Sequence, residues 1–206
     1  VGSEMCIRDR VSLIPRFYDA TSGQVLVDGV DVKDYAFDAL YDKLGYVTQK
    51  AVLFSGSIRD NIFFGESAAD ADDGALSSAI ELSQAKEFVD KLPEGTEHHI
   101  AQLGRNVSGG QKQRLSIARA LARKPEILVF DDSFSALDYR TDAKLREGLA
   151  KQLHDITKII VAQRISTIRH ADKIIVLDRG EAVGMGTHEE LMQNCEVYRE
   201  IATSQL

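Results

Sequence analysis

The sequence has few cysteines, no long apolar run and no excess of basic residues, and each shortage excludes a class of protein. Its 206 residues include only two cysteines, Cys6 and Cys195, which lack metal-site spacing and fit a reducing cytosol. No apolar run approaches the ~20 residues that span a bilayer, so any membrane association must come through a partner domain. The formal net charge of -7 and the pI near 5.3 argue against a nucleic-acid-binding protein.

A glycine-rich phosphate loop is also missing from the sequence. No stretch reads Gly-x-x-x-x-Gly-Lys-Ser/Thr, the pattern whose backbone amides and lysine hold phosphates. The length is sufficient to bury one good core, with room for a small second lobe.

The most informative stretch is Asn106 to Asp138, which begins with a helix start. Ser108 and Gln111 have the spacing of a capping box, in which the serine hydroxyl accepts from first-turn amides and the glutamine reaches back. Gly109 and Gly110 remove side-chain bulk beside these amides, so a phosphate could approach the positive end of the helix. Pro125 then predicts the end of the helix.

A buried strand is predicted directly after this helix. Residues 127 to 130 (Ile-Leu-Val-Phe) form a short unbroken apolar run, which is typical of a parallel strand covered on both faces. Asp131 and Asp132 follow it. The carboxyl end of such a strand is where open α/β sheets bind ligands.

Three motifs in this stretch together resemble the nucleotide-binding domain of an ATP-binding cassette (ABC) transporter. VSGGQ at 107–111 is similar to the family signature, ILVFD at 127–131 resembles the Walker B motif, and SALD at 135–138 resembles the D-loop. The resemblance implies an α/β P-loop NTPase (RecA-like) core. It further implies an inserted α-helical subdomain at about 58–123 and an antiparallel β region that is truncated here.

The resemblance also implies roles for individual residues. Asp131 and Gln49, the latter in a Q-loop position after a predicted strand at 44–47, would hold Mg²⁺. Asp132, Gln163 and Gln49 would act on the attacking water and the γ-phosphate. The residues expected to bind ATP across a head-to-tail dimer interface are Ser108, Gly109, Gly110, Gln111 and Asp138.

The N-terminal ten residues fit this resemblance least well. VSLIPRFYD at 11–19 resembles the segment that follows the family's phosphate loop, yet the expected Lys-Ser-Thr triplet near residues 7–9 is absent. We interpret residues 1–10 as foreign or truncated sequence and residues 11–206 as the ABC-type domain. The alternatives are a natural loss of the loop and an unusual helix start. As written, the chain is expected to bind ATP poorly or not at all.

Residues 51–65 indicate the subtype. Val52, Leu53 and Phe54 are apolar in a predicted exposed loop, and Ile58, Ile62 and Phe63 follow at roughly helical spacing, a combination that favours a contact surface. The stretch resembles the region of exporters that receives the membrane domain, so Gln49–Phe63 is the expected contact. Ordinary core of the helical subdomain is the alternative.

Two departures from the family pattern predict a weakly hydrolytic pocket. Asp132 stands where active members carry Glu, and a carboxylate shorter by ~1.5 Å reaches the attacking water poorly. Gln163 replaces the switch histidine, so it cannot supply an imidazolium charge. We therefore expect the degenerate half of a heterodimeric exporter at the cytoplasmic face of the plasma membrane. A homodimeric exporter ATPase and a soluble ABC-type ATPase or regulator are the alternatives.

The C-terminal part is expected to be scaffold. Residues 173–177 and 181–186 are predicted as a strand pair, residues 158–162 as a buried strand and residues 21–32 as a hairpin around Asp28-Gly29. Thr187 and Glu190 predict a capped helix from His188.

Overall fold

The computed structural model describes residues 4–65 and 72–205, without the side chains of residues 4–6. The chain forms two compact units, which are described separately. Unit 1 consists of residues Val1–Leu40 with Ile160–Leu206, and unit 2 of Tyr41–Ile159. Within the described residues, no helix has the length and apolar character needed to cross a membrane.

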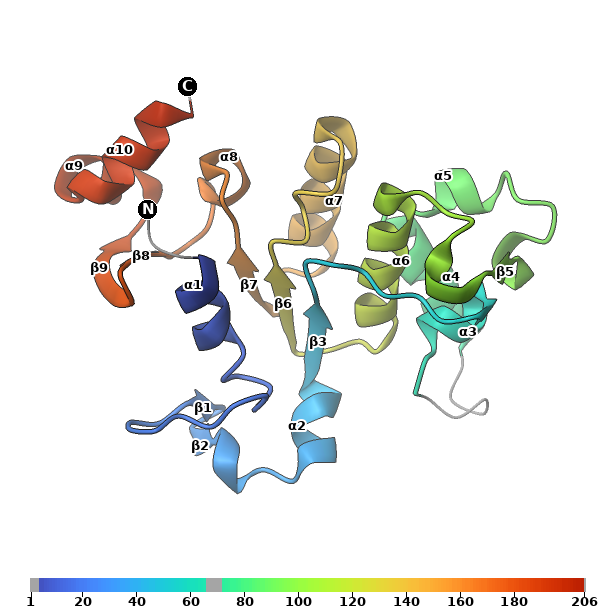
Figure 1. The fold of residues 1–206 in the computed structure, drawn as a ribbon, viewed down its shortest axis with the longest axis horizontal. Helices are drawn as coiled ribbons and strands as arrows, with labels where there is room; N and C mark the ends of the chain where they lie inside the picture. The colour runs from blue at the N-terminus through green and yellow to red at the C-terminus, as the bar shows by residue number, and fades with distance from the viewer. Residues whose placement is uncertain (1–3, 66–71, 206) are drawn as a thin grey trace. The chain divides into compact units, whose positions relative to one another are not determined.

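Unit 2 is built on a parallel sheet of strand order β3-β6-β7 (Figure 1). β3 (Leu44–Val47) pairs in parallel with β6 (Ile127–Asp131), with Val47 opposite Phe130, and β7 (Thr157–Val161) lies on the other side of β6. Leu128, Val129 and Phe130 are fully buried, which confirms the predicted two-sided burial of this strand. The predicted strand at 44–47 is also confirmed.

Helix α6 (Gly109–Ala122) is the central helix of unit 2. It begins at the predicted capping box and buries an apolar face that includes Leu115 and Leu121. This helix packs against β3, α3 (Ile58–Ile62) and α4 (Asp73–Leu82). At its crossing over β3 the backbones are close: a Cβ built on Gly45 would lie 3.0 Å from the backbone carbonyl oxygen of Ala120 on α6.

The remaining elements of unit 2 surround this core. β4 (Gly56–Ser57) and β5 (His99–Ile100) form a short antiparallel pair. Helix α4 is followed by the short helix α5 (Lys86–Val89). Short 3-10 helices, η2 (Gly95–Glu97) and η3 (Gln102–Gly104), lead into α6, and α7 (Tyr139–Gln152) packs against α4.

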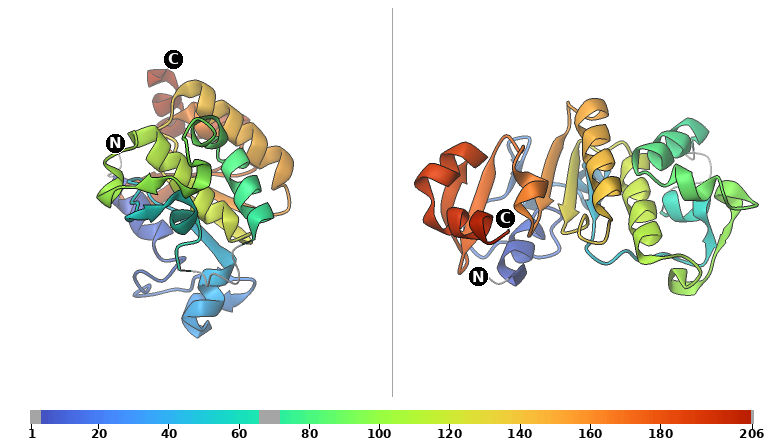
Figure 2. Two further views of the ribbon diagram at one scale, coloured as in Figure 1. Left: turned by 90° about the vertical axis from the view of Figure 1, so that its right-hand side faces the viewer. Right: turned by 90° about the horizontal axis from the view of Figure 1, so that it is seen from above.

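The C-terminal half of unit 1 is an antiparallel hairpin covered by two helices. β8 (Ile174–Asp178) pairs with β9 (Glu181–Gly186), as predicted, and α9 (His188–Asn194) and α10 (Glu196–Ser204) pack against them (Figure 2). The core between them contains Leu191, Cys195 and Tyr198, and the predicted Thr187–Glu190 capping box is present. Helix α8 (Ile165–Ile168) precedes the hairpin.

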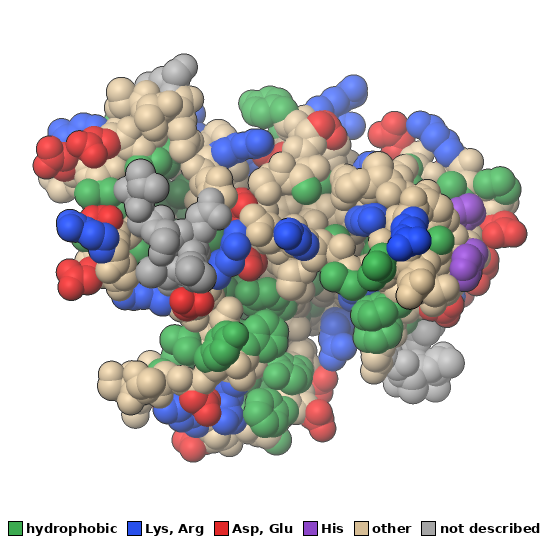
Figure 3. Space-filling view, viewed as in Figure 1, with side chains coloured by type: hydrophobic (Ala, Val, Ile, Leu, Met, Phe, Trp, Pro, Cys, Tyr) green, Lys and Arg blue, Asp and Glu red, His purple; other side chains and the backbone are tan. Residues whose placement is uncertain are grey.

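The N-terminal half of unit 1 is small and exposes several apolar side chains. Its elements are α1 (Glu4–Val11), β1 (Leu26–Val27), β2 (Val30–Asp31), η1 (Val32–Asp34) and α2 (Phe37–Lys43), the last of which ends in unit 2. Hydrophobic side chains gather around the β1–β2 hairpin on the face drawn in Figure 3. The exposed large hydrophobic residues described in this region are Phe17, Tyr18, Leu26, Val30 and Phe37.

The structure corrects several predicted details. The hairpin expected over 21–32 has strands only at Leu26–Val27 and Val30–Asp31. The strand predicted as buried at 158–162 is β7. Its first residue, Thr157, is exposed, and the other four residues are half-buried. The origin assigned to residues 1–10 stays a prediction, and residues 4–11 form α1.

Candidate functional site

The carboxyl ends of β3 and β6 bring three predicted site residues together in unit 2. Gln49 follows β3, and its Nε2 donates to Oδ2 of Asp132 at 2.9 Å, although the two residues are 83 positions apart in sequence. Asp131 ends β6, Asp132 follows it directly, and both are buried. Because neighbouring parallel strands end at one edge of the sheet, Gln49, Asp131 and Asp132 lie at the same edge, and we call these three residues the cluster.

Asp132 has an unusual backbone conformation. Its φ is +47°, in the left-handed region that aspartate tolerates better than most residues. The hydroxyl of Ser135 donates to the carbonyl of Asp132 at 2.8 Å and supports this turn. The next residue, Ser133, is fully buried, and its Oγ has no hydrogen-bond partner among the described residues. Such local strain and an unsatisfied polar atom are typical of functional turns.

The start of α6 presents a second group of predicted site residues. Ser108 Oγ accepts from the amide of Gln111 at 3.3 Å, and Gln111 Oε1 accepts from the amide of Ser108 at 2.8 Å. Ser108 and Gly109 are exposed, and a Cβ built on Gly109 would meet nothing within 4 Å. An anion could therefore approach the first-turn amides of a 14-residue helix without a steric barrier.

Asp138 is exposed at the N-cap of α7. Its carboxylate accepts from the hydroxyl of Thr141 at 2.6 Å and from the Thr141 amide at 3.0 Å. These two hydrogen bonds lower the pKa of Asp138, with the hydroxyl making the larger contribution. The residue thus stays ionised and oriented by its own helix.

Gln163 is the predicted site residue that lies in unit 1, so its surroundings are described within that unit. It follows β7, its side chain is exposed, and its carbonyl accepts from Gln205 Nε2 at 2.7 Å. The other predicted site residues all belong to unit 2.

Two structural residues that bind the chain around Gln49 were missed by the sequence analysis. Gln113 on α6 is 1% exposed, and its Nε2 donates to the carbonyl of Thr48, next to Gln49, at 3.1 Å. Arg119, also on α6, donates through Nη1 to the carbonyl of Val52 at 3.0 Å. Gln113 could have been found from the sequence, because its spacing places it on the face of the helix that otherwise carries apolar residues.

The predicted contact surface at 51–65 is smaller than expected. Leu53, Ile58, Ile62 and Phe63 are all buried, so they belong to the core, as the alternative interpretation held. The predicted exposed loop therefore presents only Val52 and Phe54. Phe64 is also exposed, and its ring stacks on that of Phe54 at 4.1 Å between centroids.

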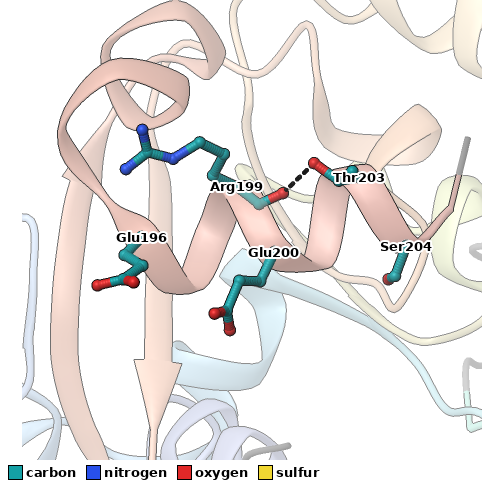
Figure 4. Close-up of a pocket in the computed structure, with 5 residues that line it drawn as sticks. All are labelled: Glu196, Arg199, Glu200, Thr203 and Ser204. Atoms are coloured by element: carbon teal, nitrogen blue, oxygen red, sulfur yellow. Dashed lines mark hydrogen bonds between the residues drawn. The ribbon is translucent and has the colours of Figure 1, made fainter.

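A shallow hollow on unit 1 contains none of the predicted site residues. It is lined only by residues of α10: Glu196, Arg199, Glu200, Thr203 and Ser204 (Figure 4). All five side chains come from a single exposed helix, and the polar contact drawn is an internal one, from the Thr203 hydroxyl to the carbonyl of Arg199 at 2.7 Å. We therefore do not include this hollow in the candidate site.

The side chains of the cluster in unit 2 are of a kind that could bind the magnesium ion of a nucleotide. Carboxylate and amide oxygens of Asp131, Asp132 and Gln49 are donors that Mg²⁺ prefers, and the open start of α6 suits a phosphate. The described residues contain no glycine-rich loop with a lysine, the pattern that holds phosphates.

Comparison with known proteins agrees with this geometry. A family model described as ABC transporter matches residues 11–135. The chain belongs to the ABC transporter family. An uncharacterized ABC transporter ATP-binding protein of Mycobacterium bovis is 47% identical over 196 residues, covering 95% of this chain and 33% of the relative.

Other relatives of this ABC domain are exporters. A putative multidrug export ATP-binding/permease protein of Bacillus subtilis is 43% identical over 95% of the chain and 33% of its own length. An ATP-dependent lipid A-core flippase of Xanthomonas campestris is 44% identical over 88% of the chain and 31% of its own length.

A solved structure, a bacterial Atm1-family ABC exporter with ATP bound, superposes with a TM-score of 0.90 at 35% identity. The match covers 96% of this chain and 35% of the exporter's. The ABC domain thus spans about a third of the proteins it matches, and its fold is that of a mixed α/β ABC ATPase domain.

Proposed function

We propose that this chain is the ATP-binding domain of a membrane exporter and that it completes a nucleotide site on a second ABC domain. The observation that carries the proposal is the exposed Ser108 at the start of α6, beside a glycine with open space around its Cβ position. Ser108, Gly109 and Gly110 would contact the partner's phosphates through a hydroxyl and backbone amides. Gln111 holds the serine in place, and Asp138 would orient groups across the interface.

The chain's own half of the interface would hold Mg²⁺ with weak hydrolysis. Asp131 and Gln49 are the expected metal ligands, and the bound nucleotide would supply the scissile phosphate bond. Asp132 is the expected base for water, but its carboxylate is one methylene short and already accepts from Gln49 at 2.9 Å. With Gln163 in place of a histidine, these features support a degenerate site and hence a heterodimer. A homodimer that tolerates both residues is the second candidate, because the signature of this chain is intact.

Contact with a membrane domain is proposed for the Gln49–Phe63 region. In this region Val52 and Phe54 expose apolar side chains, and Phe64 extends the same stacked aromatic surface. Helices α3 to α5, with α6, would form the helical subdomain inserted in the core. The complete transporter would place this domain at the cytoplasmic face of the membrane, and the acidic net charge disfavours nucleic acid as a partner.

Substitution of Gly109 by Asp tests the proposal. The new side chain has open space, and an acidic residue in the first turn suits the helix dipole, so the fold should be unchanged. A carboxylate about 4 Å from a phosphate costs roughly 4 kcal/mol for each pair of unit charges at an effective dielectric of 20. We expect ATP turnover of the complete gene product, reconstituted with its partner, to fall at least ~100-fold.

The matched control is Gly109→Ala, which adds a methyl group without charge. It should retain most of the turnover, and both variants should unfold thermally like the wild type. Unchanged turnover in Gly109→Asp would contradict a role for α6 at a nucleotide.

A further inference from the structure

The segment from Thr48 to Phe54, which follows β3, is attached to α6 at both of its ends. At the first end, the buried side chain of Gln113 donates to the carbonyl of Thr48 at 3.1 Å. At the other end, Arg119 Nη1 donates to the carbonyl of Val52 at 3.0 Å. Gln49, which contacts Asp132, lies between these two attachments.

Arg119 is held in an unusual way for an arginine. Besides Val52, it donates from Nε to the carbonyl of Asn61 at 2.6 Å and from Nη2 to Asn61 Oδ1 at 3.2 Å. Its guanidinium also lies over the rings of Phe54 and Phe64, at 5.6 and 5.8 Å from their centroids. All three hydrogen bonds go to carbonyl or amide oxygens, and burial lowers the pKa of the guanidinium. The planar fork of arginine suits this arrangement, which lysine cannot reproduce.

Asn61 extends the attachment to Phe54. This asparagine is 2% exposed, and its Oδ1 accepts from the Phe54 amide at 2.8 Å while its Nδ2 donates to the Phe54 carbonyl at 2.9 Å. Both backbone groups of Phe54 are therefore satisfied by a side chain that Arg119 itself binds. The exposed Phe54 ring is thus fixed relative to α6 through two consecutive layers of hydrogen bonds.

We propose that Gln113 and Arg119 are positioning residues that make α6 and the segment 48–54 move as one body. This role rests on the proposed function, in which a ligand bound at Ser108 acts on the start of α6. A movement of α6 would then displace Gln49, which contacts Asp132, through the bond from Gln113. It would also displace the exposed Val52 and Phe54 through the bonds of Arg119. The bonds described for Gln113 and Arg119 go to protein groups, so both are assigned as positioning residues.

Amide hydrogen exchange in the 206-residue chain tests the attachment directly. Arg119→Met keeps the stem and removes the donors, so peptides covering 51–55 should exchange about tenfold faster or more, as hydrogen bonds to a charged group predict. Arg119→Lys restores the charge but not the fork and should recover only a minor part of the protection. Gln113→Leu should raise exchange around residues 48–50.

Arg114→Met is the matched control on the same helix. Arg114 Nη1 donates to the carbonyl of Gln84 at 2.8 Å, and its guanidinium lies 4.8 Å from the ring centroid of Phe88. As in Arg119, the guanidinium donates to a backbone carbonyl, but this carbonyl belongs to the turn before α5. This variant should raise exchange around residue 84 and leave 48–54 unchanged. Equal acceleration of both segments by either variant would mean general loosening and would overturn the proposal, as would unchanged exchange at 51–55 in Arg119→Met.

A second measurement separates positioning from mere stability. In the complete gene product reconstituted with its partner, Mg·ATP should slow exchange at 48–54 in the wild type and in Arg114→Met. The response should be lost in Arg119→Met and Gln113→Leu, and a retained response would refute the positioning role. If no variant responds to ATP while the difference in the free chain persists, the attachment stands and the proposed function fails.

Discussion

Replacing Asp132 by Glu is expected to make the site faster and the domain less stable. The added methylene moves the carboxylate forward by about one C–C bond, ~1.5 Å, toward the position of an attacking water. In the wild type, the carboxylate sits 6% exposed at the end of β6 and accepts from Gln49 Nε2 at 2.9 Å. The longer side chain would have to leave or rebuild that bond. The substitution therefore changes reach and packing together.

The two magnitudes can be worked out separately. A misplacement of ~1 Å costs about a hundredfold in rate, so correcting it should raise turnover at this site by up to ~100-fold, or about 2.7 kcal/mol of barrier. Stability should move the opposite way. The φ of +47° at Asp132 disfavours glutamate more than aspartate, and an extra methylene in a buried turn adds strain, together about 1–3 kcal/mol.

Two assays read these effects. Turnover is measured on the complete gene product with its partner at saturating Mg·ATP, and the free energy of unfolding on the 206-residue chain in urea. Asp142→Glu is the matched control: Asp142 is also buried, but it pairs with Arg146 on α7 at 2.9 Å. This control should lose stability with no gain in turnover. If Asp132→Glu turns over no faster than the wild type, the degenerate-site argument is wrong and the homodimeric ATPase is favoured.

Three further predictions concern the scaffold of the site. Gly45→Ala should lower the free energy of unfolding in urea by about 1–3 kcal/mol, because its Cβ would lie 2.7 Å from Leu128 Cδ2 on β6 and 3.0 Å from the Ala120 carbonyl oxygen on α6; no loss would mean that α6 and β6 can move away from β3 freely. Ser108→Ala should cost about 1 kcal/mol by the same measurement, since it removes the N-cap of α6, and Ser108→Asp should retain the stability. Thr141 lowers the pKa of Asp138, so this carboxylate stabilises the fold above the unfolded-state pKa of about 4, and the contribution is lost as the pH falls through the lower folded-state value. In Asp138→Asn this part of the acid dependence of unfolding should disappear, and an unchanged pH profile would contradict the assignment.

Much of the scaffold around the site was readable from local patterns. The capping boxes at Ser108 and Thr187 and the strands predicted at 44–47 and 127–130 follow from residues within a few positions of each other. All four are present, and the second strand extends one residue further, to Asp131. The exposed, glycine-flanked serine follows from the same local chemistry. These features were predictable because turn and cap hydrogen bonds are made between neighbours in sequence.

The amino-acid sequence by itself determined the core strands β3 and β6, the capping boxes at Ser108 and Thr187 and the family, because these depend on short-range spacing and on motifs. The tertiary structure alone decided which apolar side chains after Gln49 face solvent, and it buried Leu53 while leaving Phe54 exposed. It also decided the bonds from Gln113 to Thr48 and from Gln49 to Asp132, which join residues 65 and 83 positions apart. No periodicity encodes such pairs, because they form only when α6 packs on β3 and when β3 and β6 align in register.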